Sequence, residues 1–295
     1  MKIYLDCWPC FMRQALSAAR RANASPEQQH DILVRTMEQL RALSREATPP
    51  EMGEGIHRLV REETQSPDPY LEGKREATAQ ALAMRPQLAA AMRDARDPLE
   101  TAVRLAIVGN IIDYGAAETF DLPATLERVL SQPLAIDGLA TLRRALARVD
   151  AVLYLADNAG ETVFDRVLIE ALPVPVTYVV KAAPVLNDAT RADAVAAGID
   201  QVAEITDTGC DAMGAPLRLC SGAFRRRFEA APLIIAKGQA NYETLSGVAA
   251  PICFLLQAKC GVIADDLGVA TGSVVVKAAD TLRARFGPME PAFGV

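Results

Sequence analysis

The spacing of apolar residues changes near residue 150 of this 295-residue chain. In the first half, apolar positions recur every three or four residues, which is typical of amphipathic helices. Ser25-Pro26-Glu27 has the residue types of a helix start, with Pro in the first turn. We therefore predict an all-helical domain over residues 1–148. The helical segments are CFMRQALSAARRA, PEQQHDILVRTMEQLRALS, EMGEGIHRLVREET, YLEGKREATAQALAMRPQLAAAMRDA and PLETAVRLAIVGNIIDYG.

From residue 150 onward, short apolar runs alternate with helical segments. This alternation predicts parallel βαβ units joined by right-handed crossovers. The predicted fold class is α/β, with a Rossmann-like, doubly wound, mostly parallel sheet in residues 149–295 after the N-terminal helical domain. The runs are AVLYLA (151–156), VPVTYVV (174–180), QVAEI (201–205), PLIIAK (232–237), PICFLLQ (251–257) and SVVVKA (273–278).

Acidic and amide side chains follow two of the predicted strands. Asp157 and Asn158 come directly after the first run, and Asp188 follows the second. Ligands of open α/β sheets bind at the carboxyl ends of the strands, so these side chains are expected to converge there. Two carboxylates and an amide oxygen suit Mg²⁺, Mn²⁺ or a similar divalent ion. Taken singly, each of these residues is also a common helix N-cap.

Glycines and lysines at strand ends add groups suited to an anion. Gly160 lets the backbone approach a ligand, and the helix starting near Glu161 directs free amides into the same space. Lys237 ends the fourth run, and Gly238 and Asn241 follow it in the segment KGQANYETL.

Lys259 follows the fifth run. A single lysine is usually solvated, but two lysines facing a carboxylate site provide the charge neutralisation that phosphoryl transfer needs. Asn110 and Asp113 interrupt an apolar helix at i and i+3, so they share one face. They form either a satisfied polar pair or a contribution to a cleft between the two halves.

Composition excludes several classes of protein. The chain is 51% apolar and carries a net charge of −6, which opposes binding to nucleic acid. The triplet Arg225–Arg227 has no aromatic or basic cluster beside it and is interpreted as a solvated helix face. No apolar run approaches the ~20 residues of a membrane span, and the start lacks a signal-peptide pattern. We therefore expect a cytoplasmic protein with no membrane partner.

Histidine and cysteine usage narrows the chemistry further. His30 and His57 are the two histidines, which excludes a multi-histidine site in the second half. The sequence Cys7-Trp8-Pro9-Cys10 leaves three interpretations open: structural or cleft-lining thiols, a metal site, or a redox switch. Zinc needs four ligands, and a thiol-exchange site needs a thiolate of low pKa, which a neighbouring Asp6 disfavours and a helix starting at Pro9 favours.

Six motifs in this order resemble one known family: CWPC, GNIID, DNAGE, LND, KGQANYE and AKC. The chain is similar to the DUF89 family, also described as ARMT1-like damage-control metal-dependent phosphatases, and in particular to prokaryotic members with a CxxC motif. The resemblance implies a helical domain packed on a Rossmann-like domain, and hydrolysis of small phosphate esters, such as sugar phosphates or damaged phosphometabolites. It also implies a divalent metal, Mg²⁺, Mn²⁺, Co²⁺ or Ni²⁺.

The resemblance also implies roles for individual residues. Asp157, Asn158 and Asp188 match the metal ligands, while Asp157, Glu161 and Lys259 are the candidate catalytic residues. Asn110 and the loop from Gly238 to Asn241 are expected to contact substrate or phosphate, and Lys237 and Asp113 match the motif strings.

Two other functions stay open at this point. One is an S-adenosylmethionine-dependent methyltransferase, although the first strand-to-helix junction has a single Gly160 instead of Gly-x-Gly-x-x-Gly. The other is a non-catalytic metabolite-binding or thiol redox-sensing module based on the cysteines. The sequence identifies neither the oligomeric state nor the physiological phosphate ester.

Overall fold

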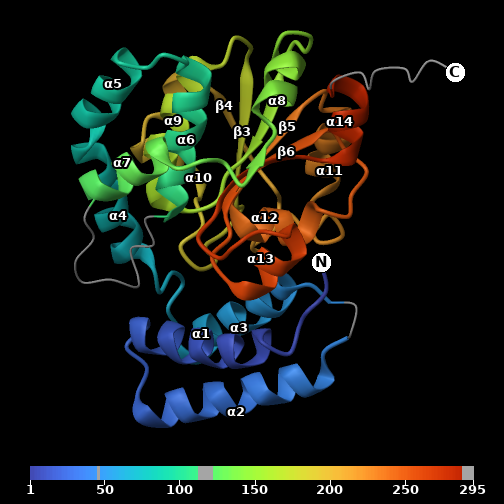
Figure 1. Cartoon of the computed structure of the whole chain (residues 1–295). Helices are drawn as coiled ribbons and strands as arrows, with labels where there is room; N and C mark the ends of the chain where they lie inside the picture. The colour runs from blue at the N-terminus through green and yellow to red at the C-terminus, as the bar shows by residue number, and fades with distance from the viewer. Residues whose placement is uncertain (45–46, 112–121, 288–295) are drawn as a thin grey trace, which may run out of the picture.

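A seven-stranded β-sheet lies at the centre of the molecule (Figure 1). The computed structural model describes residues 1–44, 47–111 and 122–287, with side chains described except at 110–111 and 122–126. The strands are β1 (Ile136–Asp137), β2 (Val152–Leu155), β3 (Val176–Val180), β4 (Glu204–Asp207), β5 (Ile234–Lys237), β6 (Ile252–Gln257) and β7 (Val274–Ala278).

Helices cover this sheet, and the first three helices of the chain form a separate layer below it in Figure 1. The first eight are α1 (Cys7–Arg21), α2 (Pro26–Ala42), α3 (Pro49–Thr64), α4 (Leu71–Ala83), α5 (Arg85–Arg93), α6 (Pro98–Ile111), α7 (Leu122–Ser131) and α8 (Leu139–Leu146). The later ones are α9 (Thr162–Ala171), α10 (Arg191–Ala196), α11 (Gly222–Ala230), α12 (Gly238–Leu245), α13 (Gly261–Leu267) and α14 (Asp280–Phe286), with short 3-10 turns η1 (Ala159–Glu161) and η2 (Ile199–Gln201).

The strand order is β1-β7-β6-β5-β2-β3-β4, and every neighbouring pair is parallel except β6 and β7. The predicted fold class is therefore confirmed: the described chain is a mixed α/β protein with a mostly parallel sheet. The chain runs from β2 outward to β3 and β4, then returns to place β5 on the other side of β2. This reversal is a topological switch point, where open α/β sheets bind ligands.

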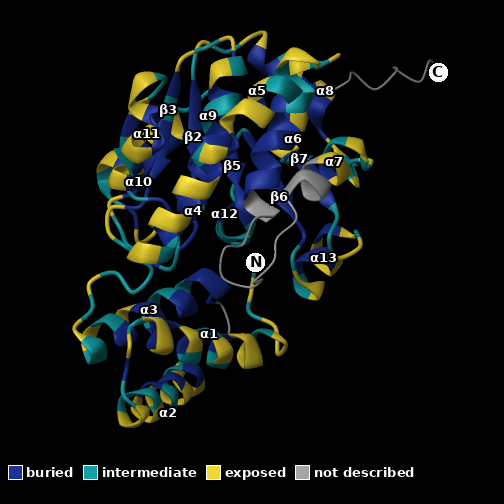
Figure 2. Ribbon diagram, turned by 90° about the vertical axis from the view of Figure 1, so that its left-hand side faces the viewer, coloured by how far each residue is buried: buried dark blue, intermediate teal, exposed yellow. Residues whose placement is uncertain are grey.

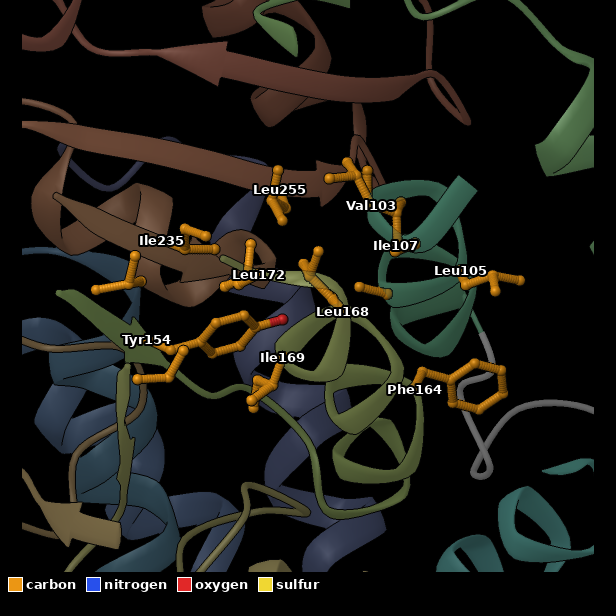
Figure 3. Packing of buried hydrophobic residues seen from close by; sticks show 14 of the residues in the cluster. Val103, Leu105, Ile107, Tyr154, Phe164, Leu168, Ile169, Leu172, Ile235 and Leu255 are labelled. Carbon is orange, nitrogen blue, oxygen red and sulfur yellow. The ribbon is translucent and has the colours of Figure 1, made fainter. Parts of the chain in front are cut away.

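The strands alternate their side chains between two buried cores. Tyr154 and Ile235 belong to the core that includes α6, α8, α9 and α14, part of which is seen in Figure 3. Leu153 and Ile234 belong to the opposite core, under α11, α12 and α13. Because both faces are covered by helices, the strands have the continuous apolar runs expected of a parallel sheet.

The first three helices form a core of their own. Phe11, Ile32 and Ile56 belong to this core, one from each of α1, α2 and α3, and it includes no sheet residue. As predicted, α2 begins after Ser25: the Ser25 Oγ accepts from the Gln28 N–H at 3.2 Å, and the Gln28 Oε1 accepts from the Ser25 N–H at 2.9 Å. In Figure 2 the three helices form a layer apart from the sheet.

Helices α5 to α8 pack instead with the core of the sheet, through residues such as Leu88, Leu105 and Leu142. The division of the chain into domains at residue 148 stays a prediction. Among the described helices, none combines the length and apolar character that a bilayer crossing requires.

Candidate active site

Backbone hydrogen bonds join the segment after β2 to the segment after β3. The Ala159 N–H donates to the Asn187 carbonyl at 2.9 Å, and the Ala189 N–H donates to the Asp157 carbonyl at 2.8 Å. Asn158 and Asp188 thereby form an isolated antiparallel β-bridge. The structure thus brings together Asp157, Asn158 and Asp188, the three predicted metal ligands.

The two aspartates at this junction are buried carboxyls. Asp157 is 7% exposed and Asp188 is 2% exposed. Burial raises the pKa of Asp157 well above its usual range, and the charges of Glu161 and Asp188 raise it further, while Lys259 and Lys181 act in the opposite direction. Burial raises the pKa of Asp188 to about 6 against the effect of Lys181. Lys259 and Lys181 therefore offset only part of the rise in pKa that burial and the neighbouring carboxylates cause at Asp157.

One oxygen of Asp188 lacks a hydrogen-bond donor among the described residues. This buried atom, Oδ2, lies 3.5 Å from Lys181 Nζ, which is an ion-pair contact longer than a normal hydrogen bond. Lys181 follows β3 directly, is 4% exposed, and donates its hydrogen bond to the Gly214 carbonyl.

Glu161 is held by two neighbours at the start of α9. The Lys237 Nζ lies 3.0 Å from Glu161 Oε2, and the Asn158 Nδ2 donates to Glu161 Oε1 at 2.6 Å. The same amide nitrogen lies 3.3 Å from Asp157 Oδ2. Asn158 therefore turns its N–H donors, and not its oxygen, toward the carboxylates in this arrangement.

Lys237 is fully buried and bridges two acids. Its Nζ donates to Asp165 Oδ1 at 2.6 Å as well as to Glu161. Burial alone would lower the pKa of Lys237, but the charges of Asp165 and Glu161 outweigh burial and raise it. The hydroxyls of Tyr154 and Tyr178 complete the network, each donating to Asp165 at 2.7 Å. The Lys237 ammonium group is engaged by carboxylates in this arrangement, and its phosphate contact stays a prediction.

The first residue of α12, Gly238, lies directly against the Asp157 carboxylate. Gly238 has a φ of +76°, and a Cβ at this position would lie 1.8 Å from Asp157 Oδ2. The position therefore requires glycine both for its backbone conformation and for the close approach. One turn later, the Asn241 Nδ2 donates to the carbonyls of Ala156 at 3.1 Å and Lys237 at 2.8 Å. The Asn241 Oδ1 is buried and has no hydrogen-bond partner among the described residues.

The remaining predicted residues approach from other elements. Lys259 follows β6, is half-buried, and its charge lowers the pKa of Asp157. Its backbone N–H donates to the Gln239 side chain, which ties the segment to α12. Asn110 lies in the last turn of α6 but its side chain is outside the described residues, as is the whole of Asp113.

The two cysteines of the CxxC motif lie at the start of α1. Cys7 is half-buried and Cys10 is exposed. Burial raises the pKa of the Cys7 thiol, and the charges of Glu243 and Cys260 raise it further. A raised pKa is the opposite of what thiol exchange requires.

The donor set fits a hard divalent cation. Two buried carboxylates, one with an oxygen that has no hydrogen-bond donor among the described residues, are the kind of oxygen ligands that Mg²⁺ and Mn²⁺ prefer. In the described part of the chain, no group of three or more His, Cys, Asp or Glu side chains is arranged to hold a metal ion. A cation here would therefore need an amide oxygen, water or substrate oxygens as further ligands.

Sequence reasoning missed two charged members of the site. Lys181 directly follows an apolar run and Lys237 ends one, so the rule that identified Lys237 at a strand end also identifies Lys181. Asp165 lies inside the helical segment ETVFDRVLIEAL, four residues after Glu161. That spacing places the two acids on one helix face, which was the available signal.

Comparison with known proteins gives matches along most of the chain. Residues 3–275 match the model of the damage-control phosphatase ARMT1-like domain. An uncharacterized protein of Methanocaldococcus jannaschii is 37% identical over 290 residues, covering 94% of this chain and 95% of that protein. A protein of Pyrococcus horikoshii named damage-control phosphatase is 32% identical over 282 residues, covering 93% and 97%. The crystal structure of a DUF89 family protein from Pyrococcus horikoshii matches with a TM-score of 0.87 at 32% identity, covering 95% of this chain and 100% of that chain.

Proposed function

Because the chain belongs to the damage-control phosphatase ARMT1-like (DUF89) family, we propose that it is a metal-dependent phosphatase that hydrolyses small phosphate esters. Sugar phosphates and related phosphorylated metabolites are the proposed substrate class. One relative along nearly the whole chain is named damage-control phosphatase.

The observation that carries this proposal is the pair of buried acids at the switch point of the sheet. Asp157 and Asp188 share one small region, and the Asp188 Oδ2 has no hydrogen-bond donor among the described residues. Like charges buried together are unfavourable unless a cation joins them. We assign Asp157, Asp188 and the amide oxygen of Asn158, after rotation of its side chain, to a divalent ion such as Mg²⁺, Mn²⁺, Co²⁺ or Ni²⁺. When bound, that ion would polarise the phosphate oxygens.

The surrounding residues would position the ester and balance its charge. Lys259 is the half-buried cation beside Asp157 and is assigned to the phosphate group. The first N–H groups of α12, which begins at Gly238 beside Asp157, are assigned to the phosphate oxygens. The Asn241 Oδ1, which has no hydrogen-bond partner in the described part of the chain, is assigned to accept from a substrate hydroxyl or a water.

Glu161 and Lys237 are assigned a supporting part. The Lys237 ammonium fixes one oxygen of Glu161, and the amide of Asn158 fixes the other. When Asn158 turns its oxygen inward, Glu161 Oε1 loses that donor and becomes an acceptor for a water or substrate proton. Asn110 is proposed as a substrate contact from the helical side.

The test is metal-dependent phosphate release by the full chain. We expect release from a panel of small phosphate esters with one or more of Mg²⁺, Mn²⁺, Co²⁺ and Ni²⁺, and loss of both release and calorimetric metal binding in Asp188→Asn. Asp200→Asn is the matched control, because Asp200 is exposed on the turn after α10. Full activity in Asp188→Asn would sink the assignment, and tight binding of S-adenosylmethionine without phosphate release would favour a methyltransferase.

A further inference from the structure

Two cysteines outside the candidate active site lie in contact with each other. Cys210 follows β4 and is half-buried, while Cys220 precedes α11 and is 4% exposed. Their Sγ atoms are 3.9 Å apart, and both are free thiols. In a disulfide the two sulfur atoms lie about 2.05 Å apart, so both side chains would have to rotate to shorten the distance between their Sγ atoms.

The backbone holds the two cysteine-bearing segments side by side. The Ser221 N–H donates to the Thr208 carbonyl at 2.9 Å. Gly209 has a φ of +73°, and a Cβ on it would lie 2.3 Å from the Ser221 Cβ. Only glycine at position 209 allows the two segments to come this close at Ser221. Cys210 is the residue after Gly209, and Cys220 is the residue before Ser221. The backbone contacts between the two segments thus keep the two thiols close together.

The two thiols differ in chemistry. The hydrogen bond with Cys220 lowers the pKa of Cys210 below its usual range, although burial acts in the opposite direction. The Thr208 hydroxyl, the Ala212 N–H and the charge of Lys181 lower this pKa further. The same hydrogen bond and burial raise the pKa of Cys220, whose S–H also lies 3.4 Å from the Pro216 carbonyl. A more accessible thiolate next to a buried thiol is the arrangement of an attacking and a resolving cysteine.

We propose that Cys210 and Cys220 form a reversible dithiol–disulfide couple, oxidised by exchange with a low-molecular-weight disulfide such as glutathione disulfide. The Cys210 thiolate attacks one sulfur of the external disulfide, which forms a mixed disulfide and releases one thiolate. Cys220 then loses its proton to solvent and attacks the Cys210 sulfur, releasing the second thiolate. Two protein thiols are oxidised and one external disulfide is reduced to two thiols.

This couple lies in a segment that touches both the candidate site and the first helical layer. The Gly214 carbonyl, inside the segment, accepts from Lys181 Nζ, and Asp211 pairs with Arg61 of α3 at 2.5 Å. The couple is nevertheless a property of the thiols themselves, so its test does not depend on phosphatase activity.

The test is peptide mapping of the full chain after exchange. Reduced protein is incubated with glutathione disulfide, its remaining thiols are blocked with iodoacetamide, and tryptic peptides are analysed by mass spectrometry. Trypsin cleaves after Arg218, so the peptides of Cys210 and Cys220 stay together only through a disulfide. We expect the linked pair, and its loss after treatment with dithiothreitol. Alkylation of both cysteines in the oxidised sample would overturn the proposal.

Single variants assign the order of attack. Cys220→Ser should retain glutathione on Cys210 as a trapped mixed disulfide, whereas Cys210→Ser should give neither the linked peptide nor an adduct on Cys220. Cys253→Ser is the matched control, because Cys253 is a fully buried thiol on β6, and it should give the wild-type linked peptide. An adduct on Cys220 in Cys210→Ser would reverse the assigned order and contradict the proposal. Should a variant fail to fold, the wild-type map alone decides whether the couple exists.

Discussion

Gly238 is the position where a single methyl group would most directly disturb the candidate site. Its φ of +76° is unfavourable for other residues, and an added Cβ would overlap Asp157 Oδ2 at 1.8 Å. The carboxylate would have to shift, which changes the position of one of the two proposed metal ligands. The steric argument holds whatever the identity of the metal.

Replacing Gly238 by Ala should therefore lower phosphate release by about 100-fold, since a displacement of roughly 1 Å in a positioned group has effects of that size. The measurement is kcat/KM with the best ester and metal found in the panel. Gly247→Ala is the control: Gly247 comes just after α12, and an added Cβ there meets nothing within 4 Å. Equal rates for Gly238→Ala and the wild type would contradict the proposed role of this contact.

His57 is a buried imidazole on α3. It is 2% exposed, and its Nε2 has no hydrogen-bond partner among the described residues. Burial lowers the pKa of His57 to about 3, and the charge of Arg61 acts in the same direction. In the unfolded chain a histidine titrates near 6.5, so below that pH the unfolded state binds a proton that the folded state excludes.

The free energy of unfolding should thus fall as the pH drops from about 6.5 toward 3, by up to about 1.4 kcal/mol per pH unit from this residue. Above pH 6.5 the contribution is constant. His57→Gln should flatten the pH dependence measured by urea unfolding, and His30→Gln should not, because His30 is exposed. Parallel pH curves for the wild type and His57→Gln would show that His57 is not the titrating group.

At the scale of elements, a buried lysine fastens α4 to α10. Lys74 Nζ lies 2.7 Å from Asp68 Oδ2 and 3.2 Å from Asp193 Oδ2, and its side chain is 2% exposed. Asp193 Oδ2 also accepts from the N–H and hydroxyl of Thr190 at the start of α10. Thr190 is two residues after Asp188, so this contact supports the segment that carries a proposed metal ligand.

Lys74→Met should lower the free energy of unfolding by about 3 kcal/mol, since it leaves two poorly solvated carboxylates without their cation. Chemical denaturation of the purified protein measures the change. Arg75→Met is the control on the same helix, because the Arg75–Glu72 pair has side chains 65% and 76% exposed, and we expect less than about 0.5 kcal/mol there. A similar loss in both variants would mean that α4 is sensitive to any change of charge.

The elements of the sheet were predictable because their apolar runs are continuous. Five of the six predicted runs coincide with β2, β3, β5, β6 and β7. The run 201–205 is shifted, because the 3-10 turn η2 occupies its start and β4 begins at Glu204. Strand β1 was missed, since two residues give no periodicity and its pairing with β7 is a long-range contact. The antiparallel direction of β7 also depends on tertiary contacts.

At the scale of the whole molecule, the sequence predicted which strand ends meet, but not how their charges pair. The convergence of Asp157, Asn158 and Asp188 follows from the rule for parallel sheets, because Asp157 and Asn158 lie just after β2 and Asp188 lies in the segment that follows its parallel neighbour β3. The burial of Lys237 against Asp165 and Glu161 does not follow, since the partners are 72 and 76 residues away. Side-chain pairing inside a core depends on packing that local patterns do not encode.

The layer of α1, α2 and α3 docks on the rest of the molecule partly through charged contacts. Arg61 donates to Asp211 Oδ2 at 2.5 Å and to the Pro184 carbonyl at 2.8 Å, and the latter lies in the segment leading to Asp188. Arg58 lies 3.8 Å from Asp211 Oδ1. One carboxylate on the β4–α11 connection thus faces two arginines of α3.

Asp211→Asn should loosen this docking while the core of the three helices, which lies within the layer, stays intact. We expect a cost of about 1 kcal/mol, which corresponds to about fivefold faster amide exchange in α3 and in the connection 65–70, with little change in the strands. Hydrogen exchange followed by mass spectrometry resolves these segments. Asp280→Asn is the control, because it removes an exposed pair with Arg283 on α14, far along the chain from α3. Uniform acceleration across the sheet and α3 in Asp211→Asn would show that the layer and the sheet unfold as one unit, against the expectation of a separately docked layer.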